Sequence, residues 1–69
     1  MYLVIEMQKN GDVLSNIPFA YSDFNQAKSK YHAILSSAAI SNVERHSAVI
    51  LEDTGRAINF EWFDHTEEE

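Results

Sequence analysis

Hydrophobic and polar positions change their spacing along the chain, and each change marks a new element. Residues 2–8 (YLVIEMQ) are rich in β-branched and aromatic side chains, and residues 13–21 (VLSNIPFAY) form a second run of this kind. The Asn10-Gly11 pair between them predicts a tight hairpin, because a type I′ turn needs positive φ at both central residues. Pro18 cannot donate a ladder hydrogen bond, so we expect the second strand at a sheet edge.

Helical spacing of apolar residues begins after Asp23. This residue is the expected N-cap, and Gln26 three positions later would complete a capping box. We predict a helix from residue 24 to about residue 39, with Ser41 and Asn42 as the point where the chain leaves it. Its apolar stripe consists of Phe24, Ala27, Tyr31, Ile34, Leu35 and Ala38.

Two further strands follow the helix. Residues 43–52 contain the run AVIL, which is apolar on both faces, and Gly55 lies in a turn that favours a left-handed residue. Residues 57–64 alternate, and residues 65–69 are expected to be an acidic tail. The alternation predicts one face with Ile58, Phe60 and Trp62, and another with Asn59 and Glu61.

The element order predicts one α+β domain over residues 1–64, a ββαββ two-layer sandwich. The first and third strands carry continuous apolar runs, as central strands do, whereas the second has a proline and the fourth alternates. We therefore expect an antiparallel sheet of order 2-1-3-4 with the helix on one face. The alternative is the order 2-1-4-3, with the first and fourth strands parallel.

One helix can cover only one face of such a sheet, yet the central strands are apolar on both faces. Leu3 and Ile5 lie opposite Val4, and Val49 lies opposite Ile50. Apolar surface is thus left uncovered in a monomer. We expect self-association, most simply as a two-fold homodimer.

Composition narrows the function classes. The net charge of −6 includes three charges from Glu67, Glu68 and Glu69, and the five cations are scattered, so direct nucleic-acid binding is not expected. Cysteine is absent, so neither disulfides nor thiolate metal sites can form. No apolar run approaches the roughly 20 residues of a membrane span, and we expect a soluble cytoplasmic protein.

No catalytic pattern is present. The three histidines have no HxxxH spacing, no serine lies in a nucleophile motif, and the two glycines are used in turns. We therefore expect a protein that is not an enzyme and has no catalytic residue, metal or cofactor. A cleft between subunits could hold a ligand, for which the candidate residues are Tyr31, His32, Arg45, His46 and Arg56. The structural alternative for His32 and His46 is a boundary or hydrogen-bonded core histidine.

The aromatic side chains of Phe60, Trp62 and Phe63 could form a base-stacking platform. No positive charge accompanies them, so core or dimer contacts are the favoured interpretation.

The segments YLVIE, at the start of the chain, and KYHAILSSAAISNVERHSAVIL (residues 30–51) carry a resemblance. They are similar to small uncharacterised proteins of phages and prophages of Firmicutes, in which Tyr31, His32, Ala38, Ala39 and His46 belong to the shared pattern. This resemblance implies no activity but favours phage roles. We expect a binding module that inhibits host defence by binding a host protein or sequestering a small ligand. The alternatives are a virion-associated structural accessory protein and an acidic mimic of nucleic acid.

Overall fold

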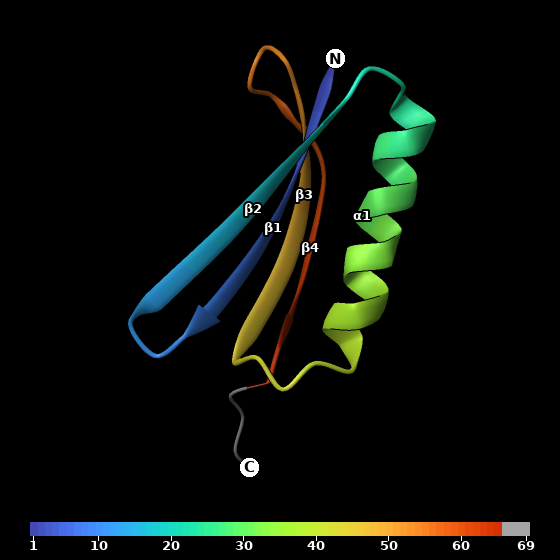
Figure 1. Cartoon of the computed structure of the whole chain (residues 1–69). Helices are drawn as coiled ribbons and strands as arrows, with labels where there is room; N and C mark the ends of the chain where they lie inside the picture. The colour runs from blue at the N-terminus through green and yellow to red at the C-terminus, as the bar shows by residue number, and fades with distance from the viewer. Residues whose placement is uncertain (66–69) are drawn as a thin grey trace.

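The computed structural model describes residues 1–65, in which one helix packs on one face of a four-stranded sheet (Figure 1). The strand order is β2-β1-β3-β4, and every neighbouring pair is antiparallel. This confirms the predicted ββαββ fold and excludes the order 2-1-4-3. The predicted acidic tail lies, apart from His65, outside the described residues. The elements are β1 (Tyr2–Asn10), β2 (Val13–Tyr21), α1 (Phe24–Ala39), β3 (Arg45–Glu52) and β4 (Ala57–Asp64).

The hairpin between β1 and β2 closes one residue later than predicted. Asn10 pairs with Val13, so the loop residues are Gly11 and Asp12 rather than Asn10 and Gly11. Gly11 has a φ of 60°, and no described non-glycine residue has a positive φ. A positive φ at the first loop residue alone is typical of a type II′ turn, so the predicted type I′ turn is wrong.

The helix begins at Phe24 and ends at Ala39, as predicted. Asp23 has an extended N-cap backbone, and its carbonyl oxygen accepts the Ala27 N–H at 3.1 Å. The carboxylate makes no capping hydrogen bond, so the predicted capping box with Gln26 does not form.

Within residues 1–65, no helix is both long and apolar enough to cross a membrane. The helix buries Ala27, Tyr31, Ile34, Leu35 and Ala38.

The loop after α1 delays the third strand. The Ser41 hydroxyl oxygen accepts the Val43 N–H at 2.9 Å, a local turn that competes with strand pairing. Strand β3 therefore begins at Arg45 and not at the predicted residue 43.

The core lies between α1 and the helix-facing side of β1 and β3. Val4 and Ile50 are completely buried, and Ala48 is buried beside them. The far end of the β1–β2 hairpin extends away from the helix (Figure 1). Val13 and Ile17 therefore remain 64% and 47% exposed, although the pairing register places them on the helix side.

A register irregularity between Ile50 and Leu51 alters the faces of β4. Ile50 pairs with Asn59, whereas Leu51 pairs with Ala57, so the intervening Ile58 is the extra residue of a β-bulge. Ile58 packs against the core below the helix. The prediction that Ile58 shares a face with Phe60 and Trp62 is therefore wrong.

Candidate functional site

The candidate site is the sheet face opposite the helix, which we call the open face. In antiparallel pairs, directly opposed residues point to the same face, so the register defines rows of side chains across the strands. Four rows cross the open face in the order β2, β1, β3, β4. They are the charged row Leu14, Lys9, Arg45 and Asp64, the mixed row Asn16, Met7, Ser47 and Trp62, the first apolar row Pro18, Ile5, Val49 and Phe60, and the second apolar row Ala20, Leu3, Leu51 and Ala57.

The open face exposes large apolar side chains. Leu14, Phe60 and Trp62 are 62%, 61% and 60% exposed, respectively. Both apolar rows lack any charged or hydrogen-bonding side chain. Four strands about 4.8 Å apart and four rows about 6.8 Å apart make a surface of roughly 500 Å². The two apolar rows make up about half of this surface, and a contiguous apolar patch of a few hundred Å² on a small protein marks a candidate interaction surface.

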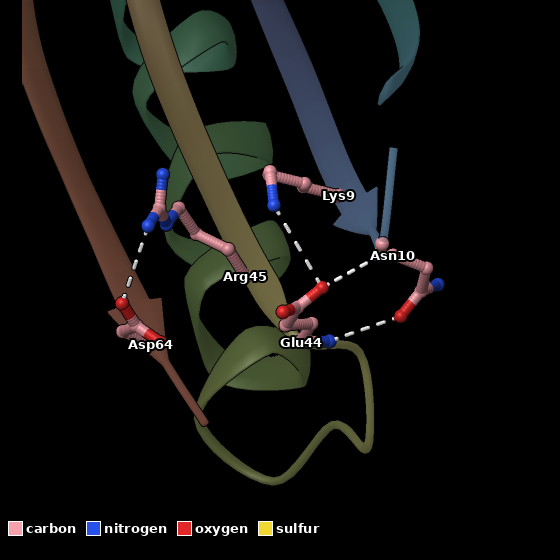
Figure 2. A network of polar contacts seen from close by, with 6 residues as sticks. Lys9, Asn10, Glu44, Arg45 and Asp64 are labelled. Carbon is pink, nitrogen blue, oxygen red and sulfur yellow. Dashed lines mark hydrogen bonds and ion pairs between the residues drawn. The ribbon is translucent and has the colours of Figure 1, made fainter. Parts of the chain in front are cut away.

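The charged row places two cations side by side (Figure 2). Lys9 and Arg45 are directly opposed on β1 and β3, where like charges repel. Each lies near a carboxylate: Lys9 Nζ is 3.8 Å from Glu44 Oε1, and Arg45 Nη2 is 3.4 Å from Asp64 Oδ2. These distances and exposures give weak ion pairs, so both cations remain accessible to a binding partner.

Glu44 also ties the loop before β3 to the β1–β2 hairpin (Figure 2). Its Oε1 accepts the Gly11 N–H at 2.6 Å, and its own N–H donates to Asn10 Oδ1 at 3.1 Å. The two bonds join residues more than thirty positions apart. They fix the hairpin turn relative to β3 and thereby set the position of Lys9 beside Arg45.

Two shallow hollows meet over Arg45 and Ser47. One, of about 260 Å³, is bounded by Met7, Lys9 and Leu14. The other, of about 370 Å³, extends from Arg45 and Ser47 to Trp62. The open face is therefore hollowed at its charged end, where apolar side chains and two cationic groups line the hollows.

The structure separates the five residues suggested as ligand-binding candidates. Arg45 lies on the open face, whereas Tyr31 is buried in the core and His46 is buried on the helix-facing side of β3. His32 is exposed on α1. Arg56 lies in the β3–β4 turn and pairs with Glu52 at 3.0 Å. They form no single site, and of the five only Arg45 contributes to the open face.

His46 takes the core role that the sequence left as an alternative to ligand binding. Its Nε2 lies 2.7 Å from Glu6 Oε2, which also accepts a hydrogen bond from Gln8 Nε2 at 3.1 Å. His46 Nδ1 is buried and has no hydrogen-bond partner. The pair bridges β1 and β3 beneath the helix, so it contributes to packing and not to the open face.

Tyr31 is 3% exposed in the same core. Burial raises the pKa of its phenol above the ordinary value of 10.0, and the negative charge of Glu61 raises it further. The neutral phenol is therefore the form that the folded protein favours.

Sequence reasoning missed Lys9, Ser47 and Met7 as members of the site. Their grouping depends on the β1–β3 register, which no single segment contains.

The structure also divides the aromatic platform that the sequence suggested. Phe63 packs against the core, and its ring stacks on the His65 ring with the two ring centroids 6.5 Å apart. Phe60 and Trp62 lie on the open face.

His65, expected in the tail, is attached to the domain. Its N–H donates to the Glu44 carbonyl oxygen at 2.8 Å, and its ring Nε2 lies 3.0 Å from the Ala38 carbonyl oxygen.

Within residues 1–65, no group of three or more His, Cys, Asp or Glu side chains is arranged to hold a metal ion. Comparison with family models, with curated proteins and with solved structures gave no significant match.

Proposed function

We propose that this protein is a non-enzymatic binding module that works as a two-fold homodimer, with the open face of each copy packed against the other. The observation that supports this proposal most strongly is the pair of apolar rows on a face that the helix leaves uncovered. A chain of 69 residues buries little core by itself, so covering this face would stabilise the fold as well as join the copies.

The size of the open face suits a second copy. Two faces of roughly 500 Å² bury about 1,000 Å² in total, the lower limit for a specific interface. Both apolar rows would be covered, and Phe60 and Trp62 would supply the aromatic side chains that are enriched at interfaces. In the orientation that brings Arg45 opposite Asp53, the two-fold axis passes through the first apolar row. This row then meets its own counterpart, and the second apolar row meets the mixed row with Met7 and Trp62.

Charge favours one orientation of the two copies. Lys9 and Arg45 lie at one end of the open face. Asp53 lies at the other end, where its carboxylate is 3.5 Å from the N-terminal ammonium and its side chain is 66% exposed. If the strands of the two sheets run in opposite directions, the cations of one copy face Asp53 of the other. If they run in the same direction, Lys9 of one copy faces Arg45 of the other, and the two cations repel.

The same proposal accommodates the roles expected from the phage resemblance. A dimer would enclose the hollows over Arg45 and Ser47 of both copies in its interface, where a small ligand could be held. Protein surfaces outside the interface would remain available to a host protein or to a component of a virion.

Native mass spectrometry of protein purified gently from its host cells tests the proposal. We expect a dimer mass, and a discrete additional mass would identify a trapped ligand. A dimer without added mass would direct the search to protein partners by pull-down from host lysate and from purified particles. A monomer at micromolar concentration would overturn the proposal.

A further inference from the structure

The two edges of the sheet differ in how they are protected against further strand pairing. Edge strands in natural proteins are blocked by proline, by lysine, by bulges or by very short length. β2 contains Pro18 near its middle, whereas β4 contains neither proline nor lysine. The bulge of β4 lies at Ile58, which leaves residues 59–64 as a regular edge.

The backbone of β4 has hydrogen-bonding groups directed away from the sheet. The His65 N–H donates to the Glu44 carbonyl oxygen, so His65 and Glu44 form a hydrogen-bonded pair. In an antiparallel ladder, hydrogen-bonded pairs recur every second residue. The next such pairs with β3 are therefore Phe63 with His46 and Glu61 with Ala48. The N–H and C=O groups of Phe60 and Trp62 therefore point to the free edge.

The side chains along this edge alternate in character. Phe60 and Trp62 lie on the open face, and Glu61 lies on the helix side. A hollow of about 280 Å³ follows the edge and is lined by Phe60, Glu61, Trp62 and Phe63. The charged residues of β4, Glu61 and Asp64, are both acidic.

We propose that the β4 edge binds an extended segment of a partner protein by strand addition, and that this segment alternates apolar and basic residues. Backbone hydrogen bonds to Phe60 and Trp62 would hold the segment, as in other cases of β-strand addition. Its apolar side chains would lie beside Phe60 and Trp62, and its basic side chains beside Glu61. The proposal rests on the function as a binding module and names the kind of partner.

A second copy of this chain fits the edge poorly. Two β4 strands related by a two-fold axis can pair with Glu61 opposite Glu61, which places like charges together. One neighbouring register places Phe60 opposite Asp64 and Glu61 opposite Phe63, which pairs charges with aromatic rings. The other pairs Phe60 with Phe60 but brings the bulged Ile58 opposite Trp62. Glu61 therefore disfavours self-pairing but attracts a basic strand. Packing of the open faces in the dimer leaves both β4 edges available.

Two synthetic eight-residue peptides provide the test, one alternating valine and lysine and one alternating valine and glutamate. Binding to the full chain is followed by backbone amide NMR shifts and by fluorescence of Trp62, the single tryptophan. We expect the valine–lysine peptide to bind at least tenfold more tightly, with the largest shifts at Phe60 and Trp62. Equal binding of both peptides, or shifts centred on another element, would overturn the proposal.

Two variants sharpen the test. Phe60→Pro removes an outward N–H without removing a bond to β3, so we expect a folded protein that no longer binds the peptide. Glu61→Lys, at an exposed position, should reverse the preference towards the valine–glutamate peptide. If Phe60→Pro fails to fold, Glu61→Lys alone decides, and an unchanged preference contradicts the proposal. Glu61 lies outside the open face, so sedimentation of the wild type and of Glu61→Lys reports the dimer separately from edge binding.

Discussion

The imidazole Nε2 of His46 lies 2.7 Å from Glu6 Oε2 beneath the helix, and this contact joins the two central strands. His46 has 5% and Glu6 17% of its side chain exposed. A polar pair in such a place is costly to break, because the remaining partner stays buried without a hydrogen bond.

Glu6→Ala should therefore lower the free energy of unfolding by about 1 to 3 kcal/mol, since both ring nitrogens of His46 would then lack partners. Urea unfolding at one fixed protein concentration measures the change. Glu52→Ala is the matched control, because Glu52 pairs with the exposed Arg56, and it should cost about 1 kcal/mol or less. Equal losses for the two variants would contradict the assignment of His46 and Glu6 as a core pair.

Ionisation of Tyr31 should make the free energy of unfolding fall as the pH rises in the alkaline range. Its pKa is raised by burial and by Glu61, so the unfolded chain loses the phenol proton first as the pH rises above 10.0. The stability that Tyr31 provides is complete below this pH and is lost as the pH rises through the higher pKa of the folded protein. The decrease of the urea midpoint between pH 9 and about pH 11 should therefore be smaller for Tyr31→Phe than for the wild type. An identical fall in both proteins would show that Tyr31 is not responsible.

Gly11 is expected to resist substitution for conformational reasons alone. Its φ is 60°, and a Cβ at this position would meet no atom within 4 Å. Gly11→Ala should cost about 1 to 2 kcal/mol in unfolding free energy, and Gly11→Asn should cost less, because asparagine tolerates the left-handed region. Urea unfolding separates the two variants. A larger loss for asparagine than for alanine would point to a steric cause instead.

Sequence patterns predicted the sheet correctly because its signals are local. Pro18 marked an edge, and the apolar runs around Val4 and Ile50 marked central strands. The turn at Gly11 and the bulge at Ile58 were missed because each shifts the chain by one residue. The bulge has no distinct residue signal, since Ile58 and Asn59 resemble ordinary strand residues. The turn does have one, because Gly11-Asp12 is itself a recognised hairpin pair that competes with Asn10-Gly11.

The site was less predictable than the fold. Lys9 and Arg45 become neighbours only through the β1–β3 register, and Glu6 and His46 are brought together in the same way. One signal was nevertheless present: Glu6 is a lone carboxylate in an apolar strand, which indicates a buried polar partner. The apolar character of both sheet faces was visible from the runs themselves, and the open face confirms it.

The proposed orientation of the dimer predicts the effect of charge reversal. Arg45→Glu should weaken dimerisation roughly thirtyfold, because the two-fold dimer loses two exposed ion pairs of about 1 kcal/mol each. Arg45→Glu combined with Asp53→Arg should restore it. Sedimentation velocity at low salt measures the dissociation constant. If Arg45→Glu instead tightened the dimer, Arg45 of one copy would face Lys9 of the other, which requires the strands of the two sheets to run in the same direction.

The central claim is that the open face joins two copies, and sedimentation equilibrium of three proteins tests it most directly. Val49 lies in the first apolar row, so Val49→Lys should convert the wild-type dimer to a folded monomer by placing a charge in the interface. Ile17→Lys introduces the same charge on the helix side of β2, where Ile17 is already 47% exposed, and should remain a dimer. A wild-type monomer, or a Val49→Lys variant that dimerises as well as the wild type, would contradict the account.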